Sequence, residues 1–365
     1  MRNKSKRDEK QEFLDEIISS KRVPSRFELM QMYRMEKDKD SCIRWSLAKA
    51  LVNRYTPESE AMLRRMACDK DGLVRIEAID SLCIGREEAT LPLLRRKMRQ
   101  ADDYLERGYA VLSYFDVWLN RYGYRRESMS RYLKSVEGLY AQEEHLWVLA
   151  MYERNRYFAG EKEALQKLKA ILLDKGINDY YVLRAVISVM EEMMNVFNKD
   201  KIKEILKEFL DREPAGLQGV KAEAEKVLES EAIVGVLFLD NKNTGLSQVL
   251  ESIGNFRMDD MQILFASAGI MPGAEIESEV VELMKQRDGV DLREEQYPKP
   301  VMNAHWYDFI VPVGIKICEE DYPFQRIIHM FENADENMPD MASAEQMVGK
   351  VADYIWDTYS KYLGK

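Results

Sequence analysis

Two patterns of hydrophobic positions divide the chain. Up to about residue 230, apolar residues recur at helical spacing with few signals of strands. From residue 233 onward, short apolar runs rich in β-branched residues alternate with helical stretches. We therefore predict a multidomain protein with an α-helical domain over residues 1–230 and an α/β domain over residues 231–365, with no flexible Gly/Ser linker between them.

The helical part contains a repeated unit. Residues 38–51 align with residues 69–82, and the pattern continues around Asp103 and Ala110. In each unit an aspartate is placed to cap a helix, and apolar residues at every fourth position (Val74, Ala78 and Leu82) form a face for packing. The unit resembles the HEAT-like repeat. The resemblance implies an armadillo-like helical solenoid, for which we expect roughly five helix pairs with irregular ends.

An arginine recurs at the same helical position in three of the units: Arg44, Arg75 and Arg107. Two interpretations are open. Each arginine can pair with the capping aspartate of an adjacent repeat, or the three can form a ladder of cations along one concave surface. We favour the pairing.

A strand, a loop and a helix follow one another where the pattern changes. The apolar run Ile233–Asp240 is typical of a buried parallel strand, and a helical pattern begins again near Ser247. Backbone N–H groups at such a helix start can bind an anion. The loop residues that could bind one are Asn241, Lys242, Thr244 and Gly245, of which Lys242 is the only cation.

This stretch resembles the phosphate loop of low-molecular-weight protein tyrosine phosphatases and the related arsenate reductases. That loop carries a cysteine, two residues, an asparagine, two residues, an arginine and a serine. Asn243 and Ser247 match it, whereas Asp240 stands at the nucleophilic cysteine and Leu246 at the arginine. The resemblance implies a doubly wound sheet of four parallel strands. We expect its strands at 233–240, 262–270, 308–313 and 325–332, with helices at 274–287 and 342–363.

The resemblance also implies that the reaction has been lost. A thiolate nucleophile and a guanidinium that holds the phosphoryl oxygens are both missing. In the family an Asp-Pro pair after the fourth strand supplies the acid, but here Asn333 takes that position beside Glu332. An asparagine cannot donate a proton as a carboxylic acid does. The relay of the arsenate reductases is also incomplete, because Cys318 lies four positions beyond Gly314.

Charge and targeting signals restrict the partners. The net charge is −10 and the pI is about 5.2, so binding along a nucleic-acid backbone is not expected. The densest basic stretch, residues 121–131, interleaves arginine with tyrosine, and we interpret it as a solvated helix pair with its rings packed inward. The chain has no apolar run long enough to span a membrane and no signal peptide, so we expect a cytoplasmic protein.

Cysteine and histidine spacing predicts no metal site and no disulfide framework. The four cysteines are scattered, and we expect them to be reduced and buried. No cofactor motif appears, and the three histidines are expected to pack rather than to act in catalysis.

Two functional hypotheses follow. The first is a non-catalytic scaffold, a pseudoenzyme whose concave repeat surface binds another protein or peptide, with self-association left open. The alternative is a phosphatase-like hydrolase or a sensor of oxyanions or phosphorylated ligands that uses the loop at residues 240–247.

Overall fold

The computed structural model describes residues 5–19, 24–52, 55–212, 217–257, 262–335 and 341–363. The chain packs as two compact units. The first comprises Met1–Gly123 and Lys134–Tyr152, and the second comprises Tyr124–Leu133 and Glu153–Lys365. The second unit therefore contains helices of the repeat region together with the sheet. A domain boundary between residues 230 and 231 stays a prediction.

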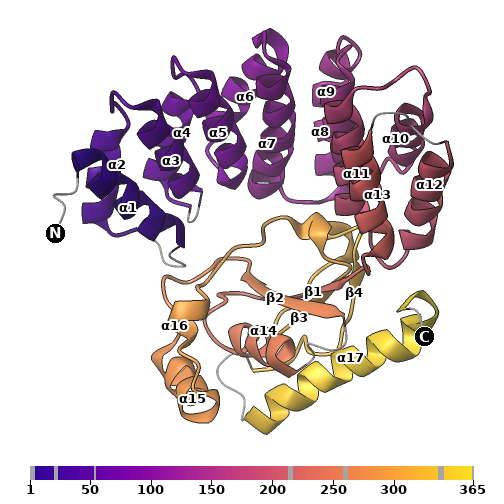
Figure 1. The fold of residues 1–365 in the computed structure, drawn as a ribbon. Coiled ribbons are helices and arrows are strands. Elements are labelled where there is room, and N and C mark those ends of the chain that lie inside the picture. The colour runs from indigo at the N-terminus through magenta and orange to yellow at the C-terminus, as the bar shows by residue number, and fades with distance from the viewer. Residues whose placement is uncertain are drawn as a thin grey trace. The chain divides into compact units, whose positions relative to one another are not determined.

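The repeat region is built from consecutive helices (Figure 1). They are α1 (Lys6–Ser19), α2 (Arg26–Met35), α3 (Ser41–Leu51), α4 (Pro57–Met66), α5 (Gly72–Ser81), α6 (Thr90–Gln100), α7 (Tyr104–Tyr122), α8 (Arg126–Tyr140), α9 (Leu146–Phe158), α10 (Ala164–Leu173), α11 (Tyr180–Met193), α12 (Lys199–Asp211) and α13 (Gln218–Glu229). In the described part of the chain, α2/α3, α4/α5, α6/α7, α10/α11 and α12/α13 pack as consecutive pairs, in line with the roughly five pairs that we expected.

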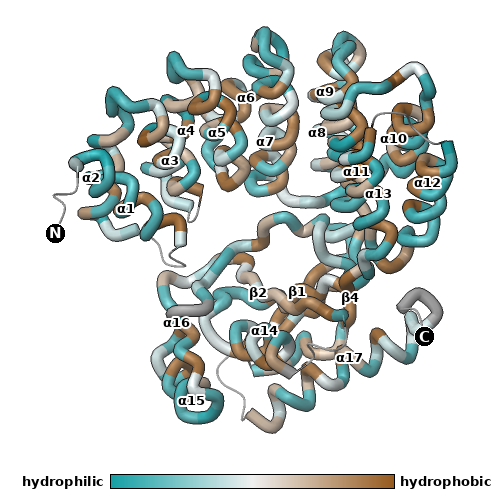
Figure 2. Tube along the Cα trace, viewed as in Figure 1, coloured by the Kyte–Doolittle hydropathy of each residue, from teal (hydrophilic) through white to brown (hydrophobic). Residues whose placement is uncertain are grey.

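Local chemistry explains where the second helix of a repeat begins. The side chains of Asp40, Asp71, Asp103 and Asp179 each accept a backbone N–H as N-caps of α3, α5, α7 and α11. The predicted buried face is confirmed, because Val74, Ala78 and Leu82 are all 0% exposed. Hydrophobic and hydrophilic residues alternate along these helices in Figure 2, as packing on one side requires.

The α/β part contains a four-stranded parallel sheet in the order β2-β1-β3-β4 (Figure 1). The strands are β1 (Val234–Asp240), β2 (Ile263–Gly269), β3 (Phe309–Pro312) and β4 (Arg326–Ile327). Every residue of the central strand β1 is buried. This arrangement, together with the helical repeats, confirms the predicted fold class.

Different elements cover the two faces of the sheet. One face packs its side chains, such as Val236 and Phe238, in a core with residues of α14 (Leu246–Arg257), α15 (Ser278–Asp288) and α17 (Met341–Leu363). The other face, with Leu237 and Leu239, is covered by side chains from the connecting segments between residues 301 and 322. A short helix, α16 (Leu292–Glu295), follows the Asp291 cap.

Two predicted boundaries were wrong. The fourth strand is much shorter than residues 325–332, because the chain turns after Ile327 and only Phe331 returns to pair with Val313. The helix predicted from residue 274 begins at Ser278. The segment before it is held in irregular form by backbone hydrogen bonds to the loop after β1, such as Ile270 N to Asp240 O at 3.0 Å and Gly273 N to Lys242 O at 2.8 Å.

The cysteines are free, but their expected burial was wrong. Cys42, Cys68 and Cys318 are exposed, and Cys83 is half-buried. None of the described helices combines the length and the apolar character needed to cross a bilayer.

Candidate functional site: the loop after β1

The loop joins the carboxyl end of β1 to the start of α14 through a tight backbone turn. Asn243 has a φ of 53°, in the left-handed region that asparagine tolerates better than most residues. This conformation turns its N–H back toward the strand, where it donates to Oδ1 of Asp240 at 2.5 Å. The match of Asn243 to the phosphate-loop pattern therefore has a structural basis.

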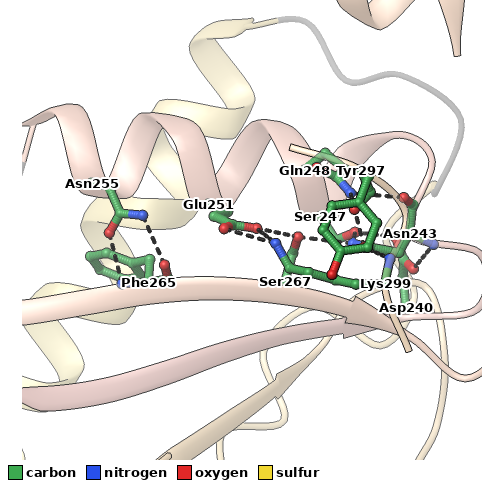
Figure 3. Close-up of polar contacts among 10 residues, drawn as sticks. All are labelled: Asp240, Asn243, Ser247, Gln248, Glu251, Asn255, Phe265, Ser267, Tyr297 and Lys299. Carbon is green, nitrogen blue, oxygen red and sulfur yellow. Dashed lines mark hydrogen bonds and ion pairs between the residues drawn. The ribbon is translucent and has the colours of Figure 1, made fainter. Parts of the chain in front are cut away.

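Asp240 fills the position of the nucleophile with a carboxylate that the loop itself binds (Figure 3). It is 2% exposed, and the Ser247 hydroxyl donates to its Oδ2 at 2.5 Å. Burial raises the pKa of Asp240, while hydrogen bonds from Ser247 and from backbone N–H groups of the loop oppose that shift. Donors at the helix start thus face a charge that belongs to the protein.

Asn243 is the centre of the polar network. Its side-chain amide donates to Ser247 Oγ at 2.9 Å and to Ser267 Oγ at 2.8 Å. Its Oδ1 accepts from the backbone N–H of Lys299 and from Nε2 of Gln248, each at 2.9 Å. Asn243, Ser247 and Gln248 are all 0% exposed. The network ties the loop to β2, α14 and the segment around residue 299.

A further acid and base extend this network. Ser267 Oγ donates to Glu251 at 2.5 Å, and the Lys299 ammonium lies 2.7 and 2.9 Å from the two oxygens of the same carboxylate. The charge of Lys299 is therefore already matched. The sequence analysis missed Gln248, Glu251 and Lys299, although the spacing of Ser247, Gln248 and Glu251 places them on neighbouring positions of one helix.

Leu246 cannot supply the positive charge that an arginine would carry at this position. Its side chain is 1% exposed and packs in the core with Val249 and Leu250. An alkyl group at this position offers no charge, and it points into the hydrophobic core rather than toward solvent.

The segment that follows β2 forms hydrogen bonds with other residues of the loop. Thr244 donates from its hydroxyl to Glu277 at 3.0 Å, and the carbonyl of Asn241 accepts from Met271 N at 2.8 Å. Gly245 is buried, whereas Lys242 is exposed. Close approach is possible because Gly269 has no side chain, since a Cβ there would lie 2.8 Å from the carbonyl carbon of Lys242.

The two residues at the position of the family's acid, Glu332 and Asn333, do not face the loop after β1 through any hydrogen bond in the described part of the chain. Glu332 lies 2.6 Å from the ring Nδ1 of His329, and Asn333 is exposed. The carbonyl of Phe331, which precedes them, accepts from Gly314 N at 2.9 Å.

The repeat arginines form ion pairs within the first unit. Arg44 binds Asp69 through two contacts of 2.7 and 2.8 Å, Arg75 binds Glu106, and Arg107 binds Glu143 at 2.9 and 3.1 Å. Hydrogen bonding to Arg44 holds the pKa of Asp69 below its usual value.

Pairing with the next repeat was predicted, but the expected partner was wrong. The capping residues Asp71 and Asp103 bind backbone N–H groups, so a second carboxylate nearby receives the arginine. Each guanidinium also donates to main-chain carbonyls of its own repeat, as Arg44 does to Asp38 O at 2.7 Å. The three arginines thus join repeats and do not form a free cationic ladder.

The basic stretch at residues 121–131 was interpreted as a solvated helix pair with its rings packed inward, and the buried rings fit that interpretation. Tyr124 and Tyr132 are 4% and 0% exposed, and Arg125 pairs with Asp321 at 2.5 Å. Within the described ranges, no group of three or more His, Cys, Asp or Glu side chains is arranged to hold a metal ion.

Comparison with known proteins identifies the repeats. Residues 31–114 match the family model of HEAT repeats. No curated protein matches the chain.

Similar solved structures include an arsenate reductase in the phosphate binding state, with 17% identity over 34% of this chain and 99% of that one, at a TM-score of 0.28. A thioredoxin-dependent arsenate reductase from Corynebacterium glutamicum is 16% identical over 63% of this chain and 93% of its own, also with a TM-score of 0.28. A low molecular weight protein tyrosine phosphatase from T. tengcongensis is 17% identical over 35% of this chain and 99% of its own, with a TM-score of 0.25.

The resemblance drawn from the sequence is therefore confirmed for the HEAT repeats. For the α/β part, the parallel four-stranded sheet is the fold that the second resemblance implied.

Proposed function

We propose that the protein is a non-catalytic scaffold of the cytoplasm, in which the helical repeats bind another protein or peptide and the phosphatase-like domain no longer transfers phosphoryl groups. The observation that carries the proposal is the state of Asp240. Its carboxylate is buried and accepts hydrogen bonds from the loop that would otherwise serve a nucleophile and its substrate. The four free cysteines fit a reducing compartment.

The chemistry of phosphoryl transfer supports this assignment. A carboxylate can act as a nucleophile, but an ionised Asp240 repels a phosphate dianion unless a cation offsets the charge. Leu246 supplies none, and the cation of Lys299 is bound to Glu251. The acid position offers Asn333, which has no acidic proton, and Glu332, which contacts His329.

The surface of the first unit supports a protein partner. The large apolar side chains of Phe27, Met30 and Tyr33 on α2 are 67%, 51% and 59% exposed. Two of them, Met30 and Tyr33, line a cavity of about 770 Å³. Exposed apolar groups gathered in this way are typical of interaction sites. We place the binding of the partner on the concave surface of the repeats. The proposal also allows the protein to associate with itself.

Turnover of an aryl phosphate tests the catalytic half of the proposal. The full-length protein is incubated with p-nitrophenyl phosphate alongside Asp240→Ala. We expect the same background rate from both. Steady turnover by the natural protein that is abolished in Asp240→Ala would contradict the proposal.

A second candidate function is oxyanion sensing, and the exposure of Lys242 beside buried loop N–H groups favours it. Titration of orthovanadate or phosphate into the full-length protein tests it through the melting temperature. A rise that disappears in Lys242→Ala would support a sensor, and no rise would leave the scaffold as the better account.

A further inference from the structure

A second cavity, of about 300 Å³, lies within the second unit, far from the loop after β1. Its lining includes Asp308, whose backbone N–H donates to the carbonyl of Gly235 at 2.9 Å. Gly235 is near the start of β1 and Asp240 is its last residue, so the two sites lie at opposite ends of the strand. Five residues of strand separate them by about 17 Å.

The walls of this cavity are aromatic. The lining rings are Tyr124, Tyr157, Phe158, Phe197, His305, Trp306, Tyr307 and Phe324. Trp306 is 54% exposed, so a large part of its surface remains uncovered by protein. Flat side chains around a small volume favour a planar ring as ligand.

Two cations stand among these rings. The ammonium of Lys162 lies 3.9 Å from the centre of the Tyr157 ring, and the guanidinium of Arg326 lies 3.4 Å from the centre of the Phe197 ring. Both residues keep surface in contact with solvent although protein surrounds their charged ends, and no salt bridge joins either one to a carboxylate in the described part of the chain. Neighbouring protein displaces water from Lys162 and lowers its pKa, which an anion at this place would reverse.

The acids in the lining are more fully matched. Glu192 accepts from Arg154 at 2.7 Å and from the Trp306 ring N–H at 3.3 Å. Asp308 accepts the backbone N–H of Gly235 at 3.0 Å, and burial raises its pKa to about 6. A net positive charge therefore remains for a ligand, from Lys162 and from Arg326, although the charge of Arg326 also acts on Asp308 and opposes the rise of its pKa.

We propose that this cavity binds a small aromatic carboxylate, with its ring among Trp306, Phe324 and their aromatic neighbours and its carboxylate at Lys162 and Arg326. The volume limits the ligand to roughly one ring system with a short acid side chain, at the low end of the size range of ligand sites.

A buried oxygen of Gln325 indicates which kind of aromatic ring the ligand carries. Oε1 of Gln325, a lining residue, is buried and has no hydrogen-bond donor among the described residues. A buried acceptor without a donor is costly, and a ligand N–H or O–H would satisfy it. An indole or a phenol carries such a donor, whereas a plain phenyl ring does not.

Calorimetric titration of the full-length protein tests the proposal. The probes are indole-3-acetate and 4-hydroxyphenylacetate. Three controls each change one property: indole-3-acetamide lacks the negative charge, tryptamine carries a positive charge instead, and hexanoate lacks the ring. We expect both aromatic acids to bind with a Kd between about 1 μM and 1 mM, and each control to bind at least about tenfold more weakly. The tryptophan fluorescence of the protein should change when 4-hydroxyphenylacetate binds, and this change should be absent in Trp306→Phe.

Variants locate the site. Lys162→Met should weaken binding by about tenfold or more, because one charge-assisted contact is lost. Lys175→Met, at another exposed lysine that does not line the cavity, should leave the affinity unchanged. Lys242→Ala, in the loop after β1, should also leave it unchanged.

Three results would overturn the proposal: no binding of either aromatic acid at about 10 mM, tighter binding of tryptamine than of indole-3-acetate, or loss of binding in Lys242→Ala but not in Lys162→Met. The proposal does not rest on the scaffold function, because Lys162→Met tests the cavity whereas turnover in Asp240→Ala tests the loop after β1, so either can fail without the other.

Discussion

Ser247 and Asp240 face each other across the loop after β1, with the serine hydroxyl 2.5 Å from one carboxylate oxygen. In the phosphate-loop pattern that the sequence resembles, the position of Asp240 holds the nucleophilic cysteine and the position of Ser247 holds the serine. Here the same two positions make a buried internal contact, and the asparagine between them holds the backbone in place. The donors of the loop thus bind the protein's own carboxylate.

The amide of Asn243 should be important for stability. In Asn243→Ala, Ser267 Oγ, Gln248 Nε2 and the Lys299 N–H lose a buried partner, and alanine is less tolerant of a φ of 53°. We expect a loss of about 3 kcal/mol or more in the free energy of unfolding, measured by urea titration. Asn241→Ala, at a half-buried position two residues earlier, should change it by less than about 0.5 kcal/mol. Equal effects of the two changes would show that the network contributes little.

An arginine at residue 246 should destabilise the fold and not restore a phosphate site. Leu246 is 1% exposed, and a guanidinium there must either enter the core or displace α14. We expect Leu246→Arg to lower the free energy of unfolding by about 3 kcal/mol or more, and the nearly isosteric Leu246→Met by less than about 1.5 kcal/mol. A stable Leu246→Arg protein that gains a melting-temperature shift with phosphate would contradict this prediction.

The ion pair of Arg44 and Asp69 should matter more than a similar pair on the surface. The Arg44 side chain is 4% exposed, so Asp69→Ala leaves a buried charge without its partner. We expect a cost of about 3 to 5 kcal/mol, seen as a lower melting temperature of the first unit. The control is Glu36→Ala, because Glu36 pairs with Arg65, whose side chain is 48% exposed and can be rehydrated. That change should cost less than about 1 kcal/mol, and a larger loss there than at Asp69 would refute the argument from burial.

Asp308 should make the protein less stable as the pH rises. Burial raises its folded pKa from 3.8 to about 6, so the folded state binds the proton more tightly than the unfolded state. This contribution is fully present below about pH 4 and is lost as the pH rises through about 6, a change of about 3 kcal/mol.

Asp308→Asn isolates that contribution, because the amide stays neutral while its oxygen can still accept the N–H of Gly235. Urea unfolding of both proteins at about pH 4 and at about pH 7 should show a relative gain for the variant at the higher pH. A constant difference between the two proteins across this range would mean that Asp308 is ionised with an ordinary pKa.

Periodicity and short motifs were enough to recognise the two architectures and the loop. The aspartate caps, the buried face with Val74 and Ala78, and the buried strand before Asp240 all depend on local spacing along the chain, which the sequence displays directly. For the same reason, Asp240 and Leu246 could be identified at the positions where the phosphate-loop pattern has its cysteine and its arginine. The short fourth strand was missed because pairing of β4 depends on β3, and the turn after Ile327 interrupts an otherwise strand-like run.

The partners of these residues were decided by tertiary structure. Local spacing could place Arg44 on a helix face, but only the packing of the next repeat brings Asp69 to it instead of the capping aspartate. Likewise, the sequence shows a carboxylate where a thiol is expected, and only the folded loop shows that this carboxylate is buried and bound by Ser247. The aromatic cavity joins residues from positions 124 to 326, which no local pattern connects. Periodicity reports on neighbours within one element, whereas charge pairing and cavities arise from side chains that are distant in the chain and adjacent only after folding.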